Sequence, residues 1–153
     1  MQNSLESNVV DAVQFVWHGE EDNLIEVTLP NPQESLQRIL RNVVRMTRWE
    51  DIRRIAKHIA SREGYASDSM TFRYPNPHAP EGTPYTNFEG VYLFDAGQKP
   101  LHVQEPAFDR LITRLLTTTI EGAIQSESNV IYEEWWQQFL ADAEIIIARS
   151  EAI

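Results

Sequence analysis

The feature that most constrains the fold is a pair of apolar stripes at helical spacing within residues 33–63. Apolar residues that recur every three or four positions lie on one face of a helix, and that face has to be buried against another layer. We therefore expect one helix over about 32–46 and a second helix directly after it. Their inward residues are Leu36, Ile39, Leu40, Val43 and Val44 in the first helix, and Trp49, Ile52, Ile55, Ala56 and Ile59 in the second.

The second of these helices carries signals at both of its ends. Thr47 and Glu50 have the spacing of a capping box, in which each side chain accepts a hydrogen bond from a free backbone N–H group. Gly64 follows the last apolar position and is suited to the left-handed conformation that ends many helices. These signals predict that the helix begins at Arg48 and ends close to Arg62.

Strand patterns flank the helical pair on both sides. Residues 9–17 are rich in β-branched and aromatic side chains, and residues 24–29 alternate apolar with polar side chains, so the two segments predict a hairpin. Residues 69–74 predict a single strand. Residues 88–94 and 101–103 flank a turn that contains glycine, and they predict a second hairpin.

Two more helices are expected after the second hairpin, over about 105–125 and about 131–149. Together the elements predict an α+β fold, with an antiparallel sheet of about five strands and about four helices packed mainly on one face. The predicted order is ββαα-β-ββαα. Residues 9–62 and 88–149 both follow the order hairpin, helix, helix, so a diverged internal duplication is one interpretation and a coincidence of element order is the other.

The length and composition indicate one globular unit. The chain has 153 residues, of which 42% are hydrophobic and 24% charged, so we expect a single domain over 1–153 with residues 1–8 as a flexible N-terminus. The sequence contains no cysteine, which excludes disulfides and thiolate metal sites and fits a reducing compartment. We see neither the pattern of a signal peptide nor an apolar run of about 18 residues, and therefore expect a cytoplasmic protein that does not span a membrane.

Charge is distributed unevenly along the chain. The formal net charge is −10, yet eight of the 13 basic residues lie within 33–63 beside only four acidic ones. That stretch therefore carries +4 and the remainder of the chain −14. An acidic surface repels phosphate backbones and anionic headgroups, so general binding to nucleic acid or to membranes is disfavoured. The balance instead favours a protein partner with a basic surface.

Three arginines form a ridge on the first predicted helix. Arg38, Arg41 and Arg45 step by three and four positions, which places them on one face. One interpretation is a solvated helix face. A second is a site for a phosphorylated or nucleotide-like anion, because guanidinium groups bind phosphate and carboxylate in a bidentate way. A third is an interface with an acidic partner, including a second copy of this chain in a homodimer.

The segment 75–87 contains too many prolines and glycines for a regular element, and it is longer than most connections. Long loops within compact domains are frequently functional, so the segment and its approach are candidates for ligand binding, with a plain strap over the sheet as the alternative. The candidate ligand-binding residues outside the arginine ridge are Arg73, Tyr74, His78 and Tyr85.

Catalysis has little support in the sequence. The four histidines are far apart and match no metal-binding spacing, and the chain contains no phosphate-binding glycine loop or nucleophile elbow. His78 and Glu81 could form an acid–base pair, which leaves a hydrolase as one hypothesis. We expect no cofactor and no metal ion.

The leading hypothesis is a non-catalytic binding or inhibitor protein that masks a basic surface on its partner, as small acidic immunity proteins do. This analogy rests on size, charge and missing catalytic motifs. The tryptophans at positions 135 and 136 are about 100° apart on a helix, so one of them is expected at the edge of the apolar stripe. The predicted docking residues are Glu20, Glu21, Asp22, Tyr132, Glu133 and Trp136.

Overall fold

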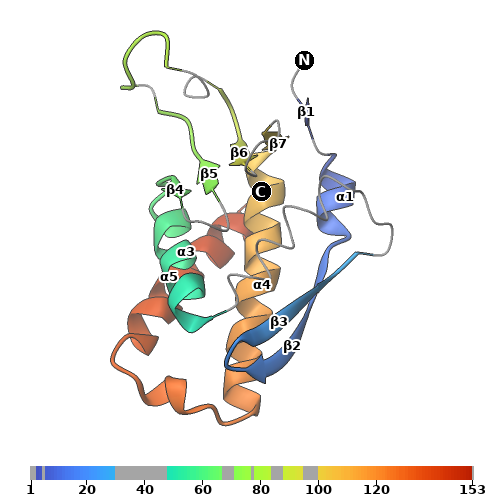
Figure 1. The fold of residues 1–153 in the computed structure, drawn as a ribbon, viewed down its shortest axis with the longest axis vertical. Coiled ribbons are helices and arrows are strands. Elements are labelled where there is room, and N and C mark those ends of the chain that lie inside the picture. The colour runs from blue at the N-terminus through green and yellow to red at the C-terminus, as the bar shows by residue number, and fades with distance from the viewer. Residues whose placement is uncertain are drawn as a thin grey trace.

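The computed structural model describes residues 3–4, 6–29, 48–66, 71–76, 78–83, 88–94 and 100–152. The predicted helix over 32–46, with its arginine ridge, lies outside the described residues, as do Thr47 and Tyr85. Within the described part the fold is α+β, as predicted (Figure 1). The helices are α1 (Ser7–Asp11), α3 (Trp49–Ala60), α4 (Glu105–Gln125) and α5 (Trp136–Glu151), with a 3-10 turn, η1, over Asn129–Tyr132.

The strands form two separate sheets. The larger sheet has the order β1-β7-β6-β5-β4, with β1 parallel to β7 and the other pairs antiparallel. The smaller sheet is the hairpin β2–β3. The strands are β1 (Asn3–Ser4), β2 (Gln14–Glu20), β3 (Asn23–Thr28), β4 (Tyr65–Ala66), β5 (Thr71–Arg73), β6 (Val91–Phe94) and β7 (Leu101–Val103).

The prediction of a single antiparallel sheet is therefore wrong. The first hairpin stays apart from the larger sheet because β2 packs against α4, where Phe15 and Trp17 are half-buried. The two hairpins consequently have different surroundings, since β6 and β7 lie inside the larger sheet. Residues 3–4, which we expected in a flexible terminus, pair with β7.

The start of the first predicted strand is also wrong, because Val9 to Asp11 belong to α1. β-branched residues favour a strand locally, but tertiary contacts with α4 hold this turn of helix. Arg110 donates two hydrogen bonds to the Asp11 carboxylate, at 2.9 and 3.0 Å. Arg114 donates to the carbonyl oxygen of Val10 at 2.7 Å, so it satisfies an acceptor in the helix.

The remaining strand predictions are confirmed where the chain is described. The hairpin partner β3, the single strand β5 and the second hairpin β6–β7 all form close to their predicted positions. The turn of the first hairpin is shorter than expected, because β2 continues through a bulge to Glu20. Gly19 has a φ of +76° there, which is a conformation that favours glycine.

Helices α3 and α4 are confirmed, with one correction at each end of α3. The helix begins at Trp49, and its N-cap is Arg48 without a side-chain hydrogen bond in place of the predicted capping box. Gly64 is not the left-handed residue; Arg62 is, with a φ of 53°. The Arg62 amide donates to Ile59 O and the Glu63 amide donates to His58 O, which is the pattern of a Schellman motif. Arg62 is held in this position because its guanidinium binds the Glu105 carboxylate at 2.6 and 3.0 Å.

The last helix begins later than predicted. Residues Asn129–Tyr132 form η1, because the Ser128 side chain accepts a hydrogen bond from the Val130 amide and so caps this turn, and α5 follows from Trp136. α4 is the centre of the molecule: α5, α1 and β2 all pack against it, and α3 packs on α5. No helix in the described ranges is both long and apolar enough to cross a membrane.

Candidate functional site

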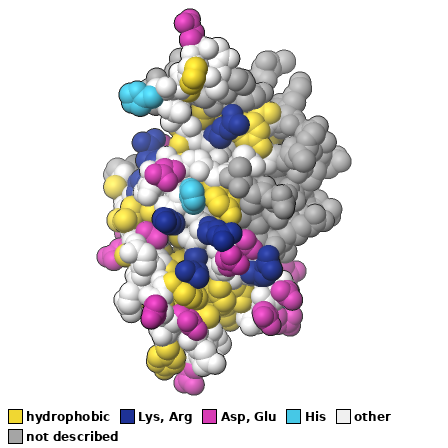
Figure 2. Space-filling view, turned by 60° about the vertical axis from the view of Figure 1, so that its left-hand side comes forward, with side chains coloured by type: hydrophobic (Ala, Val, Ile, Leu, Met, Phe, Trp, Pro, Cys, Tyr) yellow, Lys and Arg dark blue, Asp and Glu magenta, His cyan; other side chains and the backbone are white. Residues whose placement is uncertain are grey.

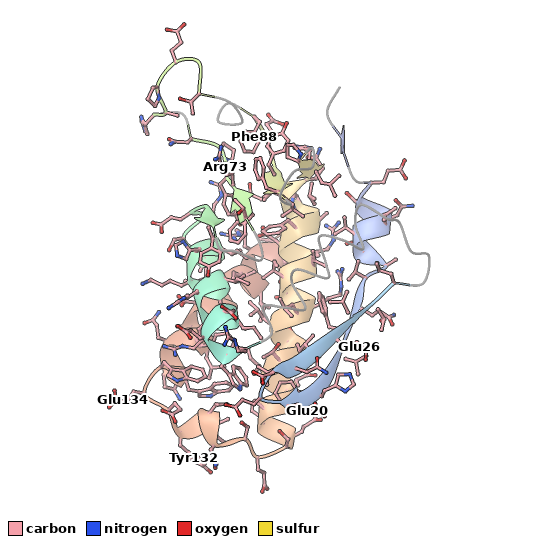
Figure 3. All side chains as sticks on the ribbon, viewed as in Figure 1. Glu20, Glu26, Arg73, Phe88, Tyr132 and Glu134 are labelled. Carbon is pink, nitrogen blue, oxygen red and sulfur yellow. The ribbon has the colours of Figure 1, made fainter. Side chains whose placement is uncertain are left out.

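The two acidic segments predicted as docking residues lie at one end of the molecule. Glu20 marks the tip of the β2–β3 hairpin and Tyr132 marks η1, and both lie at the lower end of the long axis in Figure 3. Glu21, Asp22 and Glu133 are exposed, and Tyr132 is 83% exposed. We call these five residues the acidic end. A tyrosine exposed to this extent contributes little to the core.

Beneath the acidic end lies a cluster of all four tryptophans of the chain. The ring of Trp49, from α3, lies 6.0 Å from Trp17, 5.6 Å from Trp135 and 5.8 Å from Trp136, between ring centroids. Phe139 completes the cluster at 6.0 Å from Trp49. The aromatic cluster therefore joins β2, α3 and α5, and it supports the surface on which the acidic end lies.

This cluster corrects one predicted docking residue. Trp136 is only 4% exposed, so its indole packs in the core and does not reach a partner on the surface. Trp135 is the half-buried member of the pair. The sequence analysis placed Trp136 at the edge of the apolar stripe and Trp135 in the core, and the structure reverses the two assignments.

Gly122 positions the hairpin against α4. A Cβ atom added to this residue would lie against the Trp17 indole, closer than van der Waals contact allows. Glycine within a helix costs about 1 kcal/mol relative to alanine, so its presence here is explained by the close approach of Trp17. The hairpin tip, with Glu20 and Glu21, is held in place by this contact.

At the opposite end lies a pocket of about 560 Å³. It is bordered by the described part of the segment 75–87, residues 75–76 and 78–83, which we call the proline-rich loop. The loop turns at Asn76, whose side chain accepts a hydrogen bond from the His78 amide at 3.1 Å. Of the predicted ligand residues, the structure brings Arg73 and Tyr74 to this pocket. It adds Arg62, which the sequence analysis assigned only to a helix end. His78 and Glu81 are exposed, and neither lines the pocket.

Tyr74 is placed differently from the prediction. Its ring packs near Phe72 and Phe108, and the residue is 6% exposed. Among the described residues its hydroxyl has no hydrogen-bond partner. Burial, together with the charge of Asp109, raises the pKa of Tyr74 well above the usual value for tyrosine. The hydroxyl is therefore a neutral, enclosed group.

Next to Tyr74, a set of charged side chains joins the ends of three helices. Arg149 of α5 donates two hydrogen bonds to the Asp109 carboxylate, both at 3.1 Å, and donates to the carbonyl of Ile59 at 2.8 Å. Asp109 is 3% exposed; its burial raises its pKa, and the hydrogen bonds from Arg149 oppose that rise. We call Arg62, Tyr74, Glu105, Asp109 and Arg149 the paired cluster. Its geometry is that of a structural clamp.

A second hollow, which the sequence analysis did not predict, lies between α3 and α5. This groove has a volume of about 750 Å³. Trp135 and Phe139 contribute apolar surface, and the Arg53 guanidinium lies 4.3 Å from the centroid of the Trp135 ring. Figure 2 shows basic side chains at mid-height of this face, acidic ones toward its lower end and apolar ones between them. The lining residues are Glu50, Arg53, Arg54, Lys57, Trp135, Gln138, Phe139 and Asp142.

The described side chains do not form a metal site. Among them, no group of three or more histidine, aspartate or glutamate residues is placed to hold a metal ion. No protein-family model, curated protein or solved structure matches the chain.

Proposed function

We propose that this chain is a non-catalytic binding protein whose acidic end docks onto a basic surface of another protein. One observation carries the proposal: two acidic segments that are far apart in the sequence lie at the same end of the fold, beside a tyrosine that is 83% exposed. Tyrosine is enriched among residues that anchor interfaces, and complementary charge raises association rates and excludes wrong partners.

The chemistry of the acidic end supports a protein partner over a small molecule. Glu20, Glu21, Asp22 and Glu133 are exposed carboxylates, and Tyr132 is exposed at the same end of the molecule. Neither pocket of the preceding section is lined by these residues. An exposed anionic surface outside both pockets fits a basic cleft or patch on another protein, as an inhibitor that masks a cationic active site requires.

Charge reversal tests the proposal. The variant Glu20→Lys with Glu21→Lys alters the acidic end, and Glu81→Lys with Glu89→Lys makes the same change in net charge at exposed positions of the opposite end. Proteins retained from the native host by each immobilised chain would be identified by mass spectrometry, purified, and titrated against all three chains. We expect a basic protein that binds the unaltered chain and the control, weakens with added salt, and is lost with the acidic-end variant.

Equal binding to all three chains would overturn the proposal. Equal loss with both variants would also overturn it, because the attraction would then depend on net charge alone. Tyr132→Ala adds an uncharged check, since an anchoring tyrosine should contribute about 2 kcal/mol or more to binding.

A second candidate function is the binding of a small anion in the pocket beside the proline-rich loop. The observation that favours it is the presence of Arg62 and Arg73 on the same pocket wall. A thermal-shift panel of nucleotides and sugar phosphates tests it, since a ligand at a hundredfold excess over its Kd stabilises the fold by about 2.7 kcal/mol. The shift should vanish in Arg73→Ala. No observation in the structure favours the hydrolase hypothesis with His78 and Glu81.

A further inference from the structure

One basic surface suited to the acidic end lies on the chain itself. We infer that Tyr132, Glu133 and Glu134 of one copy dock into the α3–α5 groove of a second copy, and that two copies do so reciprocally as a dimer. This inference rests on the proposed docking role of the acidic end, and it names a second copy of the chain as a partner for it.

The cations on the α3 wall of the groove carry the first part of the argument. Arg54 is already paired with Glu50 at 2.6 Å, and the Asp142 carboxylate accepts from Gln138 at 3.1 Å. In the described ranges, neither Arg53 nor Lys57 has a carboxylate within ion-pair distance. The two cations lie four positions apart on one face of α3, so they can receive two neighbouring carboxylates.

The aromatic surface of the groove carries the second part. Trp135 is half-buried and lines the groove together with Phe139, and the Arg53 guanidinium lies 4.3 Å from the centroid of its ring. A tyrosine ring packs well on such a surface, and a Tyr side chain buries about 150 Å² or more when it is enclosed. The segment from Tyr132 to Glu134 presents this ring followed directly by two exposed carboxylates. The tyrosine ring of the segment thus matches the aromatic surface of Trp135 and Phe139, and its two carboxylates match the cations on α3.

The position of the segment favours a closed dimer over an open chain. Glu134 directly precedes Trp135, which lines the groove, so the projecting segment borders the hollow on the same molecule. Figure 3 shows Tyr132 and Glu134 at the lower end of the molecule. A projection and its complement at neighbouring positions can both be used across one two-fold axis.

The net charge of −10 on each copy does not prevent this contact. At physiological ionic strength the Debye length is about 8 Å, so repulsion between distant carboxylates is screened while pairs within the groove are in direct contact. Closely apposed charges across an interface couple more strongly than charges on its rim.

A charge swap tests the dimer. One variant carries Glu133→Lys and Glu134→Lys, and the other carries Arg53→Glu and Lys57→Glu. Sedimentation equilibrium over a concentration series should show that the unaltered chain dimerises and that each variant alone is a monomer. An equimolar mixture of the two variants should restore the dimer, because each Lys-bearing segment then meets a Glu-bearing groove. Should the groove variant misfold by circular dichroism, Lys57→Glu alone replaces it.

The dimer is overturned if the unaltered chain is monomeric at every concentration, if either variant dimerises normally, or if the mixture stays monomeric. A monomeric chain that still binds a basic protein in a manner sensitive to Glu20→Lys and Glu21→Lys would overturn this inference and leave the proposed function standing. A chain that dimerises but binds no basic protein through the hairpin tip would overturn the proposed function and leave the dimer standing.

Discussion

The acidic end and the paired cluster lie at opposite ends of α4, and they differ in whether their charged side chains are buried in pairs or exposed to solvent. At the paired cluster, Arg149 donates to the Asp109 carboxylate and to the carbonyl of Ile59 at the end of α3. At the acidic end, Glu20 and Glu133 project from a base of tryptophan rings. Buried charges must be paired because desolvation is costly, whereas exposed ones need no partner for folding. Charge at the paired cluster therefore serves stability, and charge at the acidic end is available for binding.

The largest effect is expected at the paired cluster. Arg149→Ala leaves the Asp109 carboxylate buried without its partner and removes the hydrogen bond from the guanidinium to the Ile59 carbonyl. We expect the free energy of unfolding to fall by about 3–5 kcal/mol, measured by urea titration. Arg73→Ala, at an exposed position, is the control and should change stability by no more than about 0.5 kcal/mol. Similar losses in the two variants would show that the Arg149–Asp109 pair contributes no more to stability than an exposed arginine does.

The next effect lies under the acidic end. Gly122→Ala places a methyl group against the Trp17 indole, so we expect a loss of about 1–3 kcal/mol in the free energy of unfolding. In a Trp17→Ala background the same change should instead stabilise by about 1 kcal/mol, because alanine is then only the better helix former. A double-mutant cycle by thermal denaturation measures this reversal of sign. Additive effects would show that the two residues do not contact each other.

At the paired cluster, Tyr74 is expected to make the free energy of unfolding depend on alkaline pH. Burial raises its pKa, so the folded chain keeps the phenol proton at pH values where the unfolded chain releases it. The stabilising contribution is fully present below the ordinary tyrosine pKa of about 10 and is lost as the pH rises above that value. Tyr74→Phe should remove this alkaline loss. At neutral pH it should leave stability unchanged or raise it by about 1 kcal/mol, because the hydroxyl has no partner among the described residues.

The exposed Tyr132 provides the control for that experiment. Tyr132→Phe should leave the neutral-pH stability unchanged, since the side chain is 83% exposed. Urea titrations from pH 7 to above pH 10 compare the variants. If the free energy of unfolding falls equally with alkaline pH in Tyr74→Phe and in the unaltered chain, Tyr74 is not the cause of the alkaline loss.

The smallest effect is expected at the end of α4. Glu127 has a φ of 53°, and its amide and that of Ser128 donate to Ile124 O and Ala123 O in a Schellman motif. Glycine adopts this conformation without strain, so Glu127→Gly should stabilise the chain by about 0.5–1 kcal/mol by thermal denaturation. Glu127→Ala keeps the strain and should show no gain. A destabilised glycine variant would indicate that the carboxylate itself has a structural role.

Short sequence patterns predicted the helices and strands whose formation depends mainly on residues within the same segment. The apolar spacing along α3 and α4 and the alternation along β3 and β6 are properties of short segments, and these elements form as expected. α1 was missed because Arg110 and Arg114, about a hundred residues later in the sequence, hold its turn. The separation of the first hairpin was missed because it depends on Gly122 admitting the Trp17 ring.

The candidate sites divide in the same way. Each acidic segment of the acidic end is visible in the sequence, but their meeting at one end depends on the course of α4 between them. The α3–α5 groove is lined by two segments that are distant in the sequence, so no local pattern predicted it. The burial of Trp136 and of the Tyr74 hydroxyl depends on residues that no local pattern connects.

The aromatic cluster also decides what a simple optical experiment can detect. All four tryptophans lie within it, so intrinsic tryptophan emission reports on the junction of β2, α3 and α5 and not on the far end of the molecule. Circular dichroism reports on every helix. Coincident melting curves from the two signals would mean that the ends of the molecule unfold as one cooperative unit, and separated curves would mean that one end can open while the other stays folded.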